Sequence, residues 1–229
     1  MIFFKKQSRR RSESEYLFYD STSISSYSEQ LKQVKYGKNK DGDNLEQINL
    51  SLILGQSSGL PAYYRKMPGN ITDVMTMENI LAGIQYLELD KIKIVMDRGF
   101  YSEKNINELY KRHYKFLVGA KINLSFVQEL LNPVREDFDN RGNYNSDTGL
   151  FISSQMIEWN YEEIKARTGE IVKDKRRMYV HIYYNDQIAT DEKIRFNKML
   201  DSLEEEILSD DRKESNFNSK LCVKRNNNL

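Results

Sequence analysis

The sequence predicts an α/β protein built on a mixed β-sheet. Three strand-like segments come first along the chain, and segments with helical and strand-like periodicity alternate after them. Three strands in succession followed by helix–strand units are typical of a sheet that combines antiparallel and parallel pairs. Two of the apolar segments end at an aspartate, Asp20 and Asp97. Because the carboxyl ends of strands border ligand sites in α/β sheets, these aspartates are the first candidates for functional residues.

The first half of the sheet is predicted from alternation and turn residues. The segment "EYLFYD" predicts a short strand ending at Asp20, and residues 21–43, rich in Ser, Lys and Gly, predict a loop. In "LEQINLSLIL" apolar residues occupy every second position from Ile48 to Leu54, as in a strand. The turn residues "QSSG" then separate this strand from "LPAYYRKM", its expected hairpin partner.

The second half is predicted from helical periodicity and capping residues. Thr72 is the expected N-cap of an amphipathic helix over residues 73–87. A strand over 92–96 follows, Ser102 caps a helix that reaches about Arg112, and "YKFLVGA" and "LSFVQELL" predict a strand and a short helix. The ribonuclease H-like fold has this order of elements, with the first strand at the middle of the sheet beside the strand after the first helix. We therefore predict a ribonuclease H-like core over residues 16–132, preceded by a basic tail over 1–15.

The sequence pattern changes beyond residue 132. Loop-like sequence leads to strands at about 151–159 and 177–185, and residues 187–208 carry an apolar stripe at helical spacing. Residues 209–229 are low in complexity, and we expect them to be disordered.

Composition limits the classes of function. The net charge is +1 from 35 basic and 34 acidic side chains, whereas a free-standing nucleic-acid binder is usually more basic. Cys222 is the only cysteine, which excludes an internal disulfide and a zinc cluster and suits a reducing cytoplasm. No run approaches the roughly 18 apolar residues that a membrane span needs. Basic residues gather in two clusters, which either bind phosphate or form a solvated surface: Lys5, Lys6, Arg9, Arg10 and Arg11, and Lys173, Lys175, Arg176 and Arg177.

Asp20 and Asp97 suggest a metal site. If their strands are parallel neighbours, the two carboxylates converge and need a cation between them, and hard oxygen ligands favour Mg²⁺ or Mn²⁺. A pair of such ions about 3.5–4 Å apart can activate water or a 3′-hydroxyl against a phosphodiester. The alternative is structural: Asp20 caps its own loop, and Asp97 pairs with Arg98 or caps the next helix.

Four ordered segments carry a resemblance to a known family. They are "LFYDSTSIS", "YGKNKDGDNLEQINLSLIL", "GLPAYYRKMPGNITDVMTM" and "IVMDRGFYSEKNINEL", which together span about residues 16–119. The chain resembles the DDE transposases of bacterial insertion sequences, in the group with a β-rich insertion before the final carboxylate. By this resemblance residues 133–186 are part of that insertion.

The resemblance implies Mg²⁺- or Mn²⁺-dependent hydrolysis at transposon ends, followed by strand transfer into target DNA. It assigns both the catalytic and the metal-binding roles to Asp20 and Asp97, with two ions expected in the intact family enzyme. The implied partner is double-stranded DNA, with a homodimer of the intact enzyme, no membrane, no small-molecule substrate, and a bacterial cytoplasmic location.

Family members carry a third carboxylate on a helix with the pattern Tyr-x-x-Arg-x-x-x-Glu-x-x-x-x-x-x-Lys, and this chain lacks that spacing. Glu162, Glu163 and Glu204–Glu206 are better explained as a solvated helix face. Only 19 residues precede Asp20, where relatives usually carry a DNA-binding region. We therefore expect a fragment truncated at both ends with little activity alone. The alternatives are a non-catalytic fragment that binds DNA or sequesters full-length transposase, an inert remnant, and an unrelated phosphoryl-transfer enzyme.

Overall fold

The computed structural model describes residues 15–28, 30–37, 45–86, 92–165 and 167–208. The first basic cluster, Leu87 of the predicted helix, Cys222 and the predicted C-terminal tail lie outside the described residues. The described chain divides into two compact units. Unit 1 comprises the described residues up to Pro133 together with Met156–Tyr179, and unit 2 comprises Val134–Gln155 with the described residues from Val180 onward.

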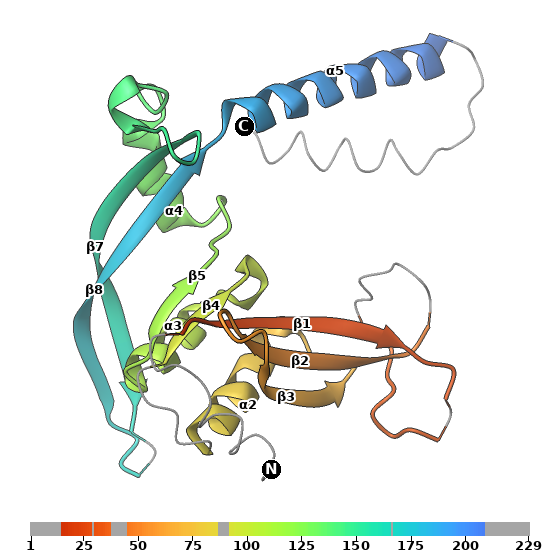
Figure 1. The fold of residues 1–229 in the computed structure, drawn as a ribbon, viewed down its shortest axis with the longest axis vertical. Helices are drawn as coiled ribbons and strands as arrows, with labels where there is room; N and C mark the ends of the chain where they lie inside the picture. The colour runs from red at the N-terminus through yellow and green to blue at the C-terminus, as the bar shows by residue number, and fades with distance from the viewer. Residues whose placement is uncertain (1–14, 29, 38–44, 87–91, 166, 209–229) are drawn as a thin grey trace. The chain divides into compact units, whose positions relative to one another are not determined.

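Unit 1 contains a five-stranded sheet (Figure 1), and in the sequence helices separate its later strands. Its elements in chain order are β1 (Leu17–Ser25), β2 (Gln47–Gly55), β3 (Pro61–Pro68), α2 (Asp73–Tyr86), β4 (Lys93–Met96), the 3₁₀ turn η1 (Arg98–Phe100), α3 (Glu103–Lys111), β5 (Lys115–Val118) and α4 (Ser125–Leu131).

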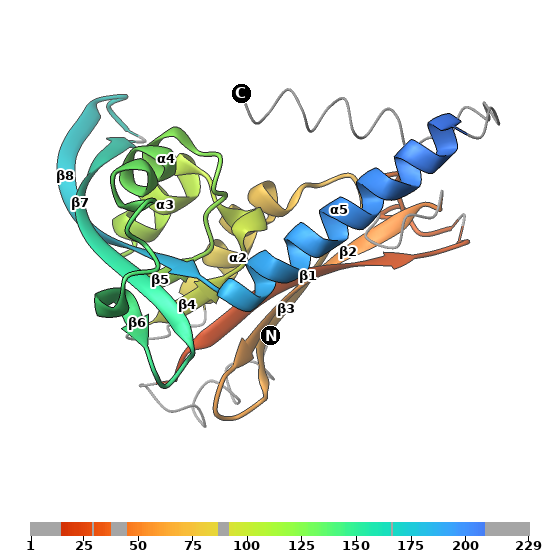
Figure 2. The same cartoon turned by 90° about the horizontal axis from the view of Figure 1, so that it is seen from above.

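The order of strands in the sheet is β3-β2-β1-β4-β5 (Figures 1 and 2). β1 pairs antiparallel with β2, and β2 pairs antiparallel with β3. β1 pairs parallel with β4, and β4 pairs parallel with β5. The first strand therefore lies at the middle, beside the strand that follows the first helix, and the predicted ribonuclease H-like fold is confirmed.

Two predictions about the first strands need correction. β1 continues to Ser25, so residues 21–25 are strand and not loop, because they pair with Gln47–Ser51 of β2. Asp20 therefore lies inside β1 and not at its end.

In β2 the buried side chains are those of Gln47, Asn49, Ser51 and Ile53. The apolar side chains at the alternate positions, Ile48, Leu50, Leu52 and Leu54, are only partly buried.

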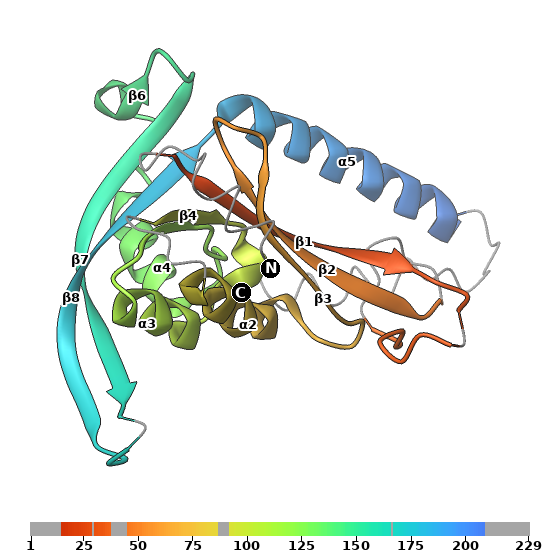
Figure 3. The same cartoon turned by 60° about the horizontal axis from the view of Figure 1, so that its bottom comes forward.

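Helices α2 and α3 cover one face of the sheet (Figure 3). The predicted apolar stripe of α2 supplies Met77, Leu81 and Ile84 to the core, and α3 supplies Ile106 and Leu109. The prediction that Ser102 caps α3 is confirmed, because its hydroxyl oxygen accepts a hydrogen bond from the Asn105 N–H at 3.1 Å.

Buried amides of β2 hold the loop that leads into α2. The Gln47 and Asn49 side chains both donate to the carbonyl of Gly69, at 3.0 and 3.2 Å, and Asn49 also donates to the carbonyl of Ile71 at 2.7 Å. A Cβ at Gly69 would collide with the carbonyl oxygens of Gln47 and Lys35. A residue without a side chain is therefore required where these backbones meet. The hydrogen bonds to the carbonyls of Gly69 and Ile71 explain why β2 buries two amide side chains on this face.

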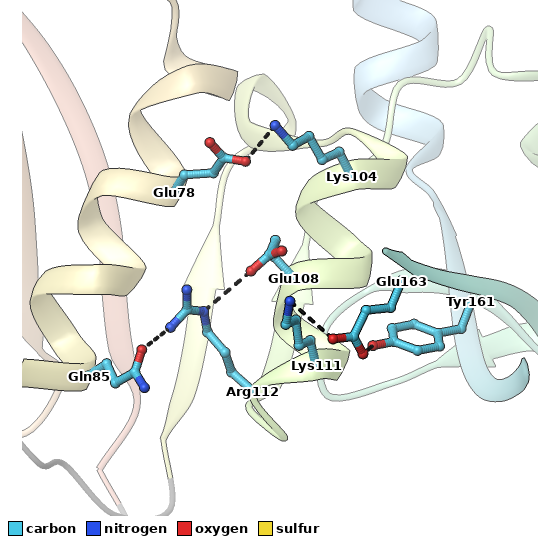
Figure 4. A network of polar contacts seen from close by, with 8 residues as sticks. All are labelled: Glu78, Gln85, Lys104, Glu108, Lys111, Arg112, Tyr161 and Glu163. Atoms are coloured by element: carbon cyan, nitrogen blue, oxygen red, sulfur yellow. Dashed lines mark hydrogen bonds and ion pairs between the residues drawn. The ribbon is translucent and has the colours of Figure 1, made fainter. Parts of the chain in front are cut away.

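Two long strands, β7 (Leu150–Ile164) and β8 (Ile171–Tyr184), form a hairpin, and its part within Met156–Tyr179 belongs to unit 1. Trp159 is buried there, and its Nε1–H donates to Oδ1 of Asn107 on α3 at 2.8 Å. Figure 4 shows the polar contacts around α3: Lys111 pairs with Glu163 of β7 at 3.1 Å, and the hydroxyl of Tyr161 donates to the same carboxylate at 2.7 Å. These contacts attach this part of the hairpin to α3.

Unit 2 contains the 3₁₀ turn η3 (Arg141–Asn143), the short strand β6 (Tyr144–Asn145), the remaining residues of β7 and β8, and helix α5 (Asp186–Leu208). The 3₁₀ turn η2 (Asn132–Val134) lies at the boundary between the units. Rings of Phe138, Tyr144, Phe151 and Tyr184 pack against one another in pairs, with centroids 5.2–6.2 Å apart. Within the residues that the structure describes, no helix combines the length and the apolar character that crossing a bilayer requires.

Candidate metal-binding site

The parallel pairing of β1 and β4 brings Asp20 and Asp97 to equivalent positions. In the register of these strands Phe18 is opposite Val95 and Tyr19 is opposite Met96, so Asp20 and Asp97 are the next residues of each chain. Asp97 retains an extended backbone, with φ −72° and ψ 164°. Neighbouring strands lie about 4.8 Å apart, so the two aspartates are adjacent.

Side-chain alternation places both aspartates on the same face of the sheet. Tyr19 and Met96 are buried beneath the helices, whereas Asp20 and Asp97 are exposed. Successive side chains of a strand point to opposite faces, so the carboxylates lie on the face that α2 and α3 leave uncovered. The site is thus formed where β4 ends and β1 continues.

Each carboxylate is oriented by the backbone that follows it. Oδ1 of Asp20 accepts a hydrogen bond from the Ser21 N–H at 2.7 Å, and Oδ1 of Asp97 accepts from the Arg98 N–H at 2.6 Å. Asp97 is the N-cap of η1, so the structural role considered for it from the sequence does occur. Oδ2 of each remains for a ligand, and within the described part of the chain neither carboxylate pairs with a cationic side chain.

The donor set fits a hard divalent cation. Two exposed carboxylates on adjacent strands repel each other, and Mg²⁺ or Mn²⁺ would neutralise them with the oxygen ligands that these ions prefer. Elsewhere, the expectation that Glu162 and Glu163 lie on a helix face is wrong: both lie on strand β7, in ion pairs with Lys173 and Lys111 at 2.6 and 3.1 Å. Among the described residues no three acidic, histidine or cysteine side chains are grouped so as to hold a metal ion.

Neighbouring polar residues surround the pair. Thr22 lies two residues beyond Asp20 in β1 and is exposed on the same face. Arg98 is exposed, and its side chain forms no ion pair with any residue that the structure describes. The two histidines lie elsewhere: His113 follows α3 with φ 56°, and Nδ1 of His181 is 2.7 Å from the Ser154 hydroxyl.

The basic cluster of β8 is largely paired with acids. Lys175 contacts Glu158 at 2.6 Å, Arg176 contacts Asp174 at 3.1 Å, and Lys173 contacts Glu162 as described above. The guanidinium of Arg176 also lies over the ring of Tyr161, 5.2 Å from its centroid. The positive charge of this cluster is therefore mostly balanced within its own hairpin.

Polar groups that were not predicted as part of the site lie beneath the aspartates. The Tyr19 hydroxyl is 2.5 Å from the Thr76 hydroxyl, and burial raises the pKa of Tyr19 to about 12. Ser21 donates to Asp73, and Asn105 donates to two carbonyls of neighbouring elements. Asp73 and Asn105 belong to two of the four segments that carried the family resemblance, so the signal was present in the sequence without its physical reason.

The strand order, with β1 at the middle beside β4, defines a domain with the ribonuclease H-like fold. Residues 11–209 match the family model "Transposase DDE domain", and the chain belongs to this family. A search of curated proteins found no match.

Solved transposase structures are similar to this chain over part of its length. The piggyBac transposase synaptic complex with hairpin DNA aligns with a TM-score of 0.39 and 12% identity, over 75% of this chain and 35% of that chain. The Mos1 transposase paired-end complex with left transposon end aligns with a TM-score of 0.34 and 11% identity, over 61% and 52%. The chain thus spans about a third and about half of these two transposases.

Proposed function

We propose that this chain is a catalytic core of a metal-dependent DNA transposase of the bacterial insertion-sequence type, in which Asp20 and Asp97 are the metal ligands and catalytic carboxylates. The observation that carries the proposal is the parallel β1–β4 register, which makes the two aspartates neighbours on one exposed face. Membership of the transposase DDE domain family supports it.

The bound Mg²⁺ or Mn²⁺ would supply Lewis-acid chemistry for phosphodiester hydrolysis and strand transfer. The residues of the chain fix where that chemistry takes place. The Ser21 and Arg98 N–H groups each hold one carboxylate oxygen and direct the other outward, toward double-stranded DNA at a transposon end. Arg98, exposed beside Asp97, is placed to contact a DNA phosphate.

We further propose that this chain cleaves DNA poorly by itself and acts in the bacterial cytoplasm. Two carboxylates hold a metal ion less firmly than three, and the family's third acidic pattern is not found in the sequence. The intact family enzyme would use two ions and act as a dimer on paired DNA ends. A chain that nicks supercoiled DNA at the rate of an intact transposase would contradict this part of the proposal.

Mn²⁺ titration tests the site directly. Asp20→Asn and Asp97→Asn keep the shape of each side chain and remove one charge, and each should weaken Mn²⁺ binding by about 10-fold or more. Asp147→Asn, in the exposed turn after β6, is the matched control for loss of a surface charge and should leave the affinity unchanged. Equal Mn²⁺ affinity in all three variants and the unmodified chain would refute the site.

A non-catalytic DNA-binding or transposase-sequestering role remains the alternative function, and no specific observation favours it. The described basic cluster is balanced by Glu158, Glu162 and Asp174, so it offers DNA little net charge. DNA affinity at two salt concentrations separates this role from an inert remnant, which should not bind; independence of the affinity from Asp20 and Asp97 separates it from the transposase role.

A further inference from the structure

A chain of buried and partly buried hydrogen bonds connects the backbone around Asp20 to the backbone around Asp97. It passes through the first turn of α2, on the face of the sheet opposite the carboxylates. None of its side chains reaches the metal side of the sheet, because the residues that flank Asp20 in β1 alternate to the helix side.

On the Asp20 side, both flanking residues are tied to α2. The Ser21 hydroxyl donates to Oδ1 of Asp73 at 2.5 Å, and Ser21 is only 3% exposed. The Tyr19 hydroxyl contacts the Thr76 hydroxyl, which also contacts the Asp73 carbonyl at 2.6 Å. The position of this part of β1 is therefore set by the first turn of α2.

On the Asp97 side, Asn105 makes the connection. Its Nδ2 donates to the carbonyl of Val74 in α2 at 3.1 Å and to the carbonyl of Phe100 in η1 at 2.8 Å. Asn105 is 2% exposed; its bond to Phe100 is buried and its bond to Val74 is partly buried. Phe100 ends the turn that Asp97 caps, and the ring of Phe100 lies 4.4 Å from that of Tyr19.

Asp73 also limits the space beside the Asp97 turn. Its Oδ2 lies 3.4 Å from the position that a Cβ on Gly99 would occupy. One side chain thus accepts from the residue after Asp20 and packs against the second residue after Asp97. A carboxylate in the first turn of α2 is also favoured by the helix dipole, which holds it in place.

We propose that Asp73 and Asn105 are positioning residues that set the separation of the Asp20 and Asp97 carboxylates and thereby the affinity of the site for divalent metal. The inference rests on the proposed function. It assigns Asp73 and Asn105 no contact with metal or DNA, since they act through the backbone of the two ligands.

The experiment measures the Mn²⁺ dissociation constant of each variant, from the electron paramagnetic resonance signal of free Mn²⁺. Urea unfolding gives the stability of the same variants. Asp73→Ala and Asn105→Ala should each weaken Mn²⁺ binding by about 10-fold or more, the range found when groups that orient metal ligands are removed. Asp73→Asn keeps an oxygen that accepts from Ser21 and should restore most of the affinity. Ser21→Ala removes the same bond from the other side with a smaller change in shape.

The matched control is Asn107→Ala. Asn107 lies on the same helix as Asn105 and loses one side-chain hydrogen bond, to Trp159, so it should lower stability without changing Mn²⁺ affinity. If Asp73→Ala, Asn105→Ala and Ser21→Ala bind Mn²⁺ like the unmodified chain while Asp20→Asn does not, the positioning role is refuted and the metal site stands. If Asp20→Asn also binds normally, the proposed function fails and this inference fails with it.

Discussion

Replacing Gly119 by alanine should deform the turn that carries Asp97. Gly119 follows β5, and its N–H donates to the carbonyl of Met96 at 3.1 Å. A Cβ at this position would lie 2.8 Å from the backbone nitrogen of Arg98 and 3.2 Å from its Cα. That nitrogen is the donor that holds Oδ1 of Asp97 at 2.6 Å. The added methyl group would therefore enter the space of the bond that orients the second aspartate.

The size of the effect follows from the geometry. A gap of 2.8 Å is about 0.6 Å shorter than the lower limit of ordinary van der Waals contact, 3.4 Å. The opposing atoms are backbone atoms, which cannot rotate away as a flexible side chain can. Overpacking of this kind costs typically about 1–3 kcal/mol. We expect a loss of stability in this range, together with a several-fold weaker Mn²⁺ affinity because the Asp97 carboxylate is displaced.

Gly142→Ala is the matched control. A Cβ at Gly142 meets no atom within 4 Å, and Gly142 is not among the glycines with positive φ. The same change of residue should be neutral there, or stabilising by about 0.4–1 kcal/mol through the unfolded state. Urea unfolding followed by circular dichroism gives the stabilities, and an Mn²⁺ titration reports on the site. If Gly119→Ala matches the unmodified chain in both measurements, the end of β5 does not confine the Asp97 turn.

Three further predictions concern buried polar groups. Burial raises the pKa of Tyr19 from 10.0 to about 12, so the neutral Tyr19 hydroxyl contributes fully to stability below pH 10, and this contribution is lost as the pH rises toward 12. Between pH 8 and 11 the unmodified chain should therefore lose about 1.4 kcal/mol more free energy of unfolding than Tyr19→Phe, measured by urea unfolding. Glu15→Ala should lower stability by about 1.5–3 kcal/mol, because the N–H groups of Ser57 and Ser58 lose their charged acceptor; Glu15→Gln should lose less, and equal losses would contradict this. Trp159→Phe should lower stability by about 1–3 kcal/mol, measured by urea unfolding followed by circular dichroism, because Asn107 loses its donor; the loss should be smaller in an Asn107→Ala background, where only the packing of the indole is lost.

The sequence contained enough information to predict the core fold. Strands over 47–55 and 61–68, both helices beside them and the cap at Ser102 follow from alternation, helical spacing and capping chemistry, which act within a few residues. The error was at the end of β1. Polar, serine-rich sequence after Asp20 looks like a loop, but pairing with β2 along its whole length extends β1 to Ser25. Such tertiary pairing overrides local preference and has no signal in a single short segment.

The same physics explains why the two aspartates could be proposed as a pair while the residues beneath them could not. Equivalent positions on two parallel neighbouring strands suffice to bring Asp20 and Asp97 together, and a fold with the first strand at the middle supplies that pairing. Local chemistry explains Asp73 only as an acidic residue in the first turn of α2, where the helix dipole favours it. Its contact with Ser21, 52 positions away, depends on how α2 crosses the sheet. Side chains on the helix face can thus influence the carboxylates only through the backbone, so loss of metal affinity in Asp73 and Asn105 variants would measure backbone position and not ligand chemistry.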